Sequence, residues 1–214
     1  MSLKPDKKIK WAILVTGWGK NAQDIIKAYA KGLLKHSEIK LLIYQSDLCG
    51  ARDLANYYNI ESLHIKKTDY PDMASYQRHL IFELKNREMD YLLLLGYKYI
   101  IKKEMLQAFP NRIINVHPSL FPSFLKTQTA IQDALDYGVK ITGITTHIID
   151  DQVDEGTILK QEVIKVKPND TFESIYPRFV KKGKKIILKT IAYIENNSFI
   201  KITCADICVN YFIY

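Results

Sequence analysis

Two polar residues that can do chemistry stand close together near the middle of the chain. Residues 112–116 form an apolar run that predicts a buried strand, and Asn115 and His117 share one face of it because side chains two apart on a strand point the same way. Pro118 ends the strand, since proline cannot donate to a sheet ladder. The amide and the imidazole would therefore lie at the carboxyl end of a strand, where open parallel sheets bind ligands. A lone histidine is most often structural, but this pairing favours a functional site.

An acidic turn is the second candidate. A strand-like segment at 141–149 runs into a turn that ends at Gly156. The acids within it are Asp150, Asp151, Asp154 and Glu155. Such a cluster could bind a metal ion, but the central glycine and the final glutamate of a calcium loop are misplaced, so we expect no metal. The alternative is a solvated acidic turn, and the pattern alone does not separate a site from a surface.

A glycine loop between a strand and a helix is the third candidate. The apolar run 9–16 predicts the strand, and a helical pattern follows at 22–34. Glycines permit a tight turn there, and the amino end of the helix behind it attracts an anion. The residues that would hold a phosphate are Gly17, Gly19, Lys20 and Asn21. The loop has neither the P-loop spacing nor the third glycine of the dinucleotide fingerprint, so a tight turn without a ligand stays an alternative.

Alternating strand and helix patterns organise the first half of the chain. Strands are predicted at 9–16, 40–44, 62–65 and 91–95, and helices at 22–34, 51–58 and 76–88. This alternation predicts an α/β fold with a mainly parallel, twisted sheet and helices on both faces.

The second half of the chain changes character. Two long strands, 141–149 and 157–166, flank the polar turn and predict an antiparallel addition to the sheet. Helices are predicted at 130–137 and 171–194. The last segment, 199–214, is apolar and aromatic, and it could be an extra strand or an interface. We expect one domain over 1–195 and a tail of unknown role over 196–214.

Composition and charge indicate an ordinary globular protein. Of its residues, 47% are apolar and 25% are charged, as in an ordinary globular protein. A chain of 214 residues is long enough to bury a core that needs no disulfide or metal. The net charge of +8 favours acidic partners, but the lysines are spread along the chain. The three cysteines are odd in number and have no metal-binding spacing, so a disulfide framework is not expected. This favours a reducing location, the cytoplasm. No apolar run is long enough to span a bilayer and the start is no secretory signal, so we expect no membrane partner.

Two segments of the chain carry a family pattern. The first reads NVHPSLFP, and the second, further along, reads TGITTHIIDDQVDEGTIL. Together they resemble the folate-dependent formyltransferases, most closely the glycinamide ribonucleotide formyltransferases of purine biosynthesis. That family shows Asn-x-His-Pro-Ser-Leu-Leu-Pro and then Thr-Gly-x-Thr-x-His-x-Val-Asp-x-x-x-Asp-x-Gly. The loop GWGKN and the run LLGY also match, and the resemblance implies that family's Rossmann-like fold over roughly residues 10–195.

The resemblance implies a role for each polar residue of the candidate site. Asn115 would donate a hydrogen bond to the oxyanion formed when an amine attacks a formyl carbon, and His117 would assist and take part in proton transfer. Asp154 would orient His117 and an ordered water, and His147 would support the site from behind. The implied co-substrate is 10-formyltetrahydrofolate, with no metal. The residues implied to bind its pterin are Tyr97, Tyr99, Ile100, Ile101, Ile149, Asp150 and Asp151.

The chain departs from the family pattern at the expected acceptor site. The loop 123–129 has neither the glycine nor the histidine that is usual there, and Lys20 replaces a small hydroxyl residue. Gly183 falls where the family carries an acid that contacts the substrate ribose. These departures leave the identity of the acceptor amine open, whereas Asn115, His117 and Asp154 all match the family pattern.

Three functions stay open on these grounds. The first is formyl transfer to glycinamide ribonucleotide, a phosphorylated small-molecule amine. The second is transfer to another amine, such as an amino sugar linked to a nucleotide. The third is a folate-binding relic without catalysis. We expect no nucleic-acid partner, because the RNA-binding domain of a methionyl-tRNA formyltransferase has no room in this chain, and a homodimer stays open.

Overall fold

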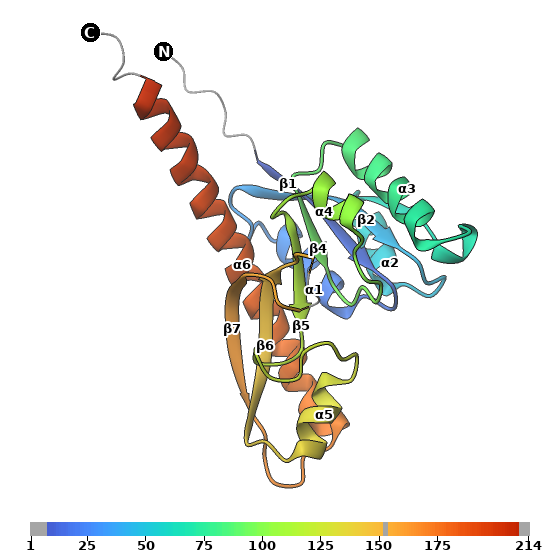
Figure 1. Cartoon of the computed structure of the whole chain (residues 1–214), viewed down its shortest axis with the longest axis vertical. Helices are drawn as coiled ribbons and strands as arrows, with labels where there is room; N and C mark the ends of the chain where they lie inside the picture. The colour runs from blue at the N-terminus through green and yellow to red at the C-terminus, as the bar shows by residue number, and fades with distance from the viewer. Residues whose placement is uncertain (1–7, 152–153, 210–214) are drawn as a thin grey trace.

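Seven strands form one sheet, with helices packed on both of its faces (Figure 1). The computed structural model describes residues 8–151 and 154–209. The strands are β1 (Ile9–Val15), β2 (Ser37–Tyr44), β3 (Glu61–His64), β4 (Tyr91–Leu94), β5 (Ile113–His117), β6 (Ile141–Ile148) and β7 (Ile158–Lys165). The helices are α1 (Lys20–Ala30), α2 (Gly50–Tyr57), α3 (Met73–Asn86), α4 (Lys103–Ala108), α5 (Ala130–Tyr137) and α6 (Phe172–Val209), with a 3-10 turn at Lys67–Asp69.

The strand order is β3-β2-β1-β4-β5-β6-β7. The strands from β3 to β5 in that order are parallel, and β6 runs antiparallel to both β5 and β7. The predicted fold class, mainly parallel with an antiparallel addition, is therefore confirmed. The chain moves outward from β1 through β2 and β3 and then returns to β4 on the other side of β1. Such a reversal opens a ligand crevice at the carboxyl ends of the strands.

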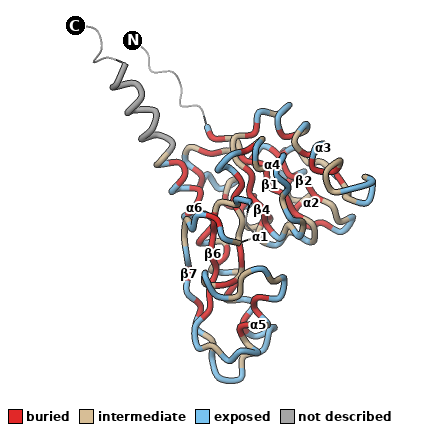
Figure 2. Tube along the Cα trace, in the orientation of Figure 1, coloured by how far each residue is buried: buried red, intermediate tan, exposed pale blue. Residues whose placement is uncertain are grey.

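Alternate residues of β1 face two separate cores. Trp11, Ile13 and Val15 pack in one core with residues of α1, α2 and α6, whereas Ala12 and Leu14 pack in the other with residues of α3 and α4. Figure 2 shows the central strands buried along most of their length. A parallel strand that is covered on both faces reads as a continuous apolar run, which is why β1 and β4 are evident in the sequence.

Local contacts correct several predicted boundaries. Strand β2 begins at Ser37 rather than at residue 40, because buried Ser37 accepts a hydrogen bond from the indole N–H of Trp11 at 3.0 Å. Helix α1 ends at Ala30 rather than at residue 34, because Gly32 adopts a φ of 69° and turns the chain out of the helix. The sequence does not predict helix α4, because Met105 is its one buried residue and so no helical period of apolar residues is visible.

The long C-terminal helix corrects the prediction for the last segment. Helix α6 begins at Phe172, contains Pro177 and continues to Val209. The alternative of an extra strand at 199–214 is wrong as far as residue 209, and residues 210–214 lie outside the described residues. A short apolar run does not show its period clearly, so helix and strand are hard to tell apart there. The alternative of an interface stays a prediction.

Candidate active site

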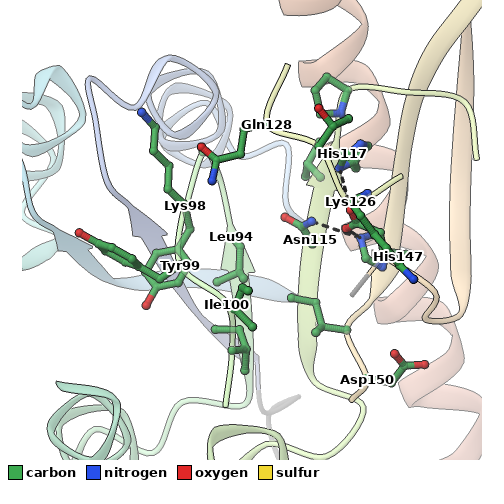
Figure 3. Close-up of a pocket in the computed structure, with 18 of the residues that line it drawn as sticks. Leu94, Lys98, Tyr99, Ile100, Asn115, His117, Lys126, Gln128, His147 and Asp150 are labelled. Carbon is green, nitrogen blue, oxygen red and sulfur yellow. Dashed lines mark hydrogen bonds and ion pairs between the residues drawn. The ribbon is translucent and has the colours of Figure 1, made fainter. Parts of the chain in front are cut away.

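The carboxyl ends of β4 and β5 open into a cavity of ≈460 Å³ (Figure 3). Its walls come from the loop after β4, the end of β5, the loop before α5 and the turn after β6. Asn115 and His117 from β5 and Asp154 from the turn after β6 all line it. The volume lies in the range of small-molecule sites, about 300–1,000 Å³. The structure therefore places the predicted residues around one ligand-sized space.

The imidazole of His117 lies between two acceptors. It is 5% exposed, and its Nδ1 lies 3.5 Å from Oδ2 of Asp154. Its Nε2 lies 2.9 Å from the carbonyl oxygen of Phe124. Because a carbonyl oxygen can only accept, Nε2 carries a proton in this arrangement and Nδ1 faces the carboxylate. The predicted approach of Asp154 to His117 is present, while the catalytic roles of the two residues stay predictions.

The side chain of Asn115 is held by His147 from the neighbouring strand. The two residues are directly opposite each other in the β5–β6 ladder, and Nδ2 of Asn115 lies 3.2 Å from Nε2 of His147. Burial lowers the pKa of His147, although the nearby Asp154 carboxylate acts against this shift. A neutral His147 can accept one amide N–H at Nε2, which leaves the second N–H of Asn115 for the cavity. His147 thus holds the Asn115 amide, while its supporting role in the site stays a prediction.

Every residue predicted to bind the pterin lines the cavity. Tyr97, Tyr99, Ile100 and Ile101 come from the loop after β4, and Ile149, Asp150 and Asp151 come from the turn after β6. A buried side chain that the sequence analysis missed shapes the first of these loops. The amide of Gln77 donates to the carbonyl of Ile100 and accepts from the N–H of Lys102, both at 2.8 Å. No sequence signal marks Gln77, because its position in α3 is like that of a core residue.

The walls of the cavity combine apolar and charged side chains. Tyr97, Ile100 and Ile101 in one loop and Ile149 in the other supply apolar surface, and the carboxylates of Asp150 and Asp151 in the turn after β6 are exposed. In Figure 3 Lys98 extends away from Asp150, on the side of the cavity where Gln128 lies. No ion pair of Lys98 occurs among the described residues. The cavity therefore has an acidic end and a basic end, and a ligand of mixed polarity would be oriented by them.

The glycine loop lies beside this cavity and not in its described lining. Gly19 precedes α1 with a φ of 74°, and Lys20 pairs with Asp24 at 3.1 Å. The loop is tied to the cavity wall, because Thr16 donates to the carbonyl of Gly96 through its hydroxyl at 2.7 Å. Gly17, Gly19, Lys20 and Asn21 are thus next to the site, at the amino end of a helix. Whether they hold a phosphate stays a prediction.

Gly183 of α6 faces the glycine loop. A side chain added at Gly183 would begin 3.2 Å from Oδ1 of Asn21, so α6 approaches the loop closely at this point. An acidic side chain there would lie beside any phosphate that the loop bound. Its absence removes a negative charge from the neighbourhood of the predicted phosphate site. The contact agrees with the expectation that residue 183 belongs to the acceptor side.

Neither a metal site nor a membrane span is evident in the described part of the chain. Within residues 8–151 and 154–209, no three His, Cys, Asp or Glu side chains are grouped so that they could hold a metal ion. Within the same residues, no helix is long and apolar enough to cross a membrane.

The fold and the site define a class of protein. A mainly parallel sheet whose carboxyl edge carries an amide, an imidazole and a carboxylate around one cavity is typical of an α/β protein with a ligand site at that edge. The model of the formyl transferase family matches residues 9–191, so the chain belongs to the formyl transferase family.

Proteins whose sequences or folds resemble this chain have names that resemble one another. The chain is 31% identical over 176 residues to the phosphoribosylglycinamide formyltransferase of Bacillus subtilis, which covers 82% of this chain and 89% of that protein. It is 30% identical over 192 residues to the chloroplastic enzyme of that name from Vigna unguiculata, covering 86% of this chain and 60% of the relative. A crystal structure of glycinamide ribonucleotide transformylase 1 from Symbiobacterium toebii matches with a TM-score of 0.83, 30% identity and 87% coverage of each chain.

Proposed function

We propose that the chain transfers a formyl group from 10-formyltetrahydrofolate to a primary amine, and that this amine is glycinamide ribonucleotide. The observation that carries the proposal is the meeting of Asn115, His117 and Asp154 at the wall of one cavity. The names of the relatives from Bacillus subtilis and Symbiobacterium toebii support it. On this proposal the protein acts in purine biosynthesis in the cytoplasm, and its partners are small molecules.

The three polar residues have complementary tasks in the proposed reaction. 10-Formyltetrahydrofolate supplies, when bound, a formyl group activated by its attachment to a ring-linked nitrogen. Asn115 directs its free amide N–H to the formyl oxygen, where negative charge develops as the amine attacks. His117 would take part in proton transfer, and the carboxylate facing its Nδ1 fixes the ring. As the bond from the formyl carbon to the new amine forms and the bond to the folate nitrogen breaks, an ordered water held by Asp154 would carry the proton from the amine to that leaving nitrogen.

The folate would be held mainly by the two loops that form the cavity walls. The residues concerned are Tyr97, Tyr99, Ile100 and Ile101 on one side and Ile149, Asp150 and Asp151 on the other. The carboxylates of Asp150 and Asp151 suit the amino and N–H donors of a pterin ring. The side chain of Gln77 keeps the first loop in place by its two hydrogen bonds to the backbone.

The acceptor would lie between the catalytic residues and the glycine loop. The N–H groups at the amino end of α1 can bind its phosphate, with Gly17, Gly19, Lys20 and Asn21 as the contributing residues. The ammonium group of Lys98 adds positive charge on the cavity wall. Both features favour an acceptor with an anionic group.

A second acceptor is favoured by the surroundings of Gly183. The helix carries no side chain where it packs against Asn21, so Gly183 adds no negative charge beside the glycine loop. A more strongly anionic amine, such as an amino sugar linked to a nucleotide, fits that condition. The altered loop 123–129 supports the same alternative.

A turnover assay separates the two acceptors. The purified chain would be mixed with 10-formyltetrahydrofolate and either glycinamide ribonucleotide or a nucleotide-linked amino sugar, and the release of tetrahydrofolate would be followed by absorbance. Turnover with glycinamide ribonucleotide supports the main proposal, and turnover with the amino sugar alone supports the second. Folate binding without turnover on either amine contradicts both and leaves a binding relic.

A further inference from the structure

We infer that Lys126 is a positioning residue for the reaction, because it ties the acidic turn after β6 to the loop before α5 and so aims the carboxylate of Asp154 at His117. The inference rests on the proposed function. Lys126 belongs to the loop 123–129, the part of the site where the chain departs from the family pattern.

Lys126 makes two contacts with consecutive residues of the turn. Its backbone N–H donates to Oδ2 of Asp154 at 2.8 Å, and this is the oxygen that faces Nδ1 of His117. Its Nζ lies 2.5 Å from Oε1 of Glu155. The N–H contact is a charge-assisted hydrogen bond, which is stronger than one between neutral groups. One residue of the loop thus restrains both the catalytic carboxylate and the residue after it.

The same loop contacts the other side of the imidazole. The carbonyl of Phe124 accepts from Nε2 of His117 at 2.9 Å. The loop therefore touches both members of the His117–Asp154 pair, through the backbone of Phe124 and the backbone of Lys126. A shift of the loop would change the distance and the angle between the ring and the carboxylate.

The loop is itself anchored on both sides of Lys126. Before it, the hydroxyl of Ser119 donates to the carbonyl of Ser123 at 2.7 Å. After it, the hydroxyl of Thr127 donates to the carboxylate of Asp133 in α5 at 2.7 Å. These hydrogen bonds fix the backbone on both sides of Lys126, so that Lys126 can restrain the acidic turn.

The backbone on both sides of the contact is strained. Phe124, Lys126 and Asp154 have φ values of 54°, 60° and 59°. A residue other than glycine is disfavoured in this left-handed region, so such residues persist where surrounding contacts hold them. The two segments are therefore shaped by the contacts between them.

The ion pair between Lys126 and Glu155 acts on geometry more than on stability. The two side chains are 56% and 40% exposed, and exposed pairs contribute little to the stability of the fold. Catalysis is more sensitive, because a displacement of about 1 Å can reduce a rate by about 10²-fold. Loss of the pair should leave the fold intact and reduce kcat.

The test uses Lys126→Gly in the full chain. Glycine keeps the backbone N–H and accepts a φ of 60°, so the variant removes the ammonium group without adding strain. With 10-formyltetrahydrofolate and glycinamide ribonucleotide, we expect kcat to fall about tenfold while KM for the folate changes less than about twofold. The charge swap Lys126→Glu with Glu155→Lys should recover most of the lost kcat, because it restores the pair in reverse.

Glu88→Gly is the matched control. Glu88 has a φ of 54° and pairs with Lys10 at 2.8 Å at the exposed surface, outside the cavity lining. Its replacement should leave kcat unchanged. An unchanged kcat in Lys126→Gly, or a fall equal to that of Glu88→Gly, would overturn the inference. The absence of recovery in the charge swap would do the same.

A readout without turnover separates this inference from the proposed function. The ¹⁵N resonance of Nδ1 in His117 reports the nearby carboxylate. It should move in Lys126→Gly and return toward its original position in the charge swap. If the unmodified chain releases no tetrahydrofolate with any amine, the proposed function fails, and this resonance alone decides about Lys126. An unmoved resonance would then overturn the positioning role.

Discussion

At the scale of single residues, the amide of Asn115 depends on the protonation of its neighbour. Burial lowers the pKa of His147, so its Nε2 can accept from Asn115 when the ring is neutral. Protonation of His147 would turn that acceptor into a second donor and release the amide. Below the ordinary histidine pKa of about 6.5, the unfolded chain binds this proton more readily than the folded chain, so this contribution to stability falls as the pH falls.

Asn115→Ala tests the oxyanion role. The variant keeps the strand but removes the amide donor, and we expect kcat to fall about 10²-fold or more, as for other lost oxyanion donors. Initial rates with saturating 10-formyltetrahydrofolate check this, and the melting temperature serves as the folding control. A fall of less than about threefold would remove Asn115 from the role.

Asp154→Asn separates charge from structure at the acidic turn. Asparagine tolerates a positive φ and can still accept from the N–H of Lys126, so the turn should keep its shape. We expect a melting temperature within a few degrees of the original and a loss of kcat of about 10²-fold, the magnitude of general acid–base assistance. Thermal unfolding and turnover, measured together, check this. An unfolded variant would show that the role of Asp154 is structural.

At the scale of elements, one buried carboxylate of β7 pairs with several lysines of helix α6. Glu162 is 7% exposed and lies 2.9 Å from Nζ of Lys182 and 2.6 Å from Nζ of Lys189. Lys185 lies 3.2 Å away. Hydrogen bonds from Lys189 and Lys182 lower the pKa of Glu162 to about 2. Three turns of the helix thus converge on one residue of the strand, near the point where Gly183 meets the glycine loop.

Glu162→Gln should loosen this junction. We expect the melting temperature at pH 7 to fall by about 5 °C, because hydrogen bonds to a charged group are lost. The pKa of Glu162 is lowered in the folded chain, so its stabilisation is complete above about pH 4.5 and is lost as the pH falls toward 2. The difference between variant and original should shrink over that window. Glu88→Gln, in an exposed pair, is the control and should shift the melting temperature by about 1 °C or less. A constant difference down to pH 2 would contradict the assignment.

At the scale of the whole molecule, the features that the sequence predicts are those that depend on residues close together in the chain. The buried parallel strands were visible because both faces of β1 and β4 are covered. Asn115 and His117 were visible because strand geometry puts alternate residues on one face. By contrast, the side chain of Gln77 contacts the backbone of the loop after β4, and Lys126 contacts the acidic turn through both its N–H and its ammonium group. Sequence spacing does not predict such contacts, because the segments are far apart in the chain. The start of β2 at Ser37 likewise depends on Trp11, which lies in another strand.

Folate binding should stabilise the whole chain, since a ligand that binds the folded state alone shifts the unfolding equilibrium. At a concentration of about 100 times its Kd, the stabilisation is about 2.7 kcal/mol, which raises the melting temperature of a chain of this size by roughly 5–10 °C. 10-Formyltetrahydrofolate or tetrahydrofolate can serve as the probe in a thermal shift measurement. Asn115→Ala should keep most of this shift, because its amide acts on the formyl oxygen and not on the pterin.

The wall of the cavity offers a variant that removes the shift alone. Ile100 is 62% exposed and lines the cavity, so Ile100→Asp should leave the melting temperature of the free chain nearly unchanged while a charge on the apolar wall weakens folate binding. Phe82 is 58% exposed on α3, outside the described cavity lining, and Phe82→Asp should keep the full shift. Equal shifts in both variants would mean that the ligand binds away from the loop after β4. Loss of the shift in Ile100→Asp alone would mean that the folate binds against the loop after β4, beside Asn115, His117 and Asp154.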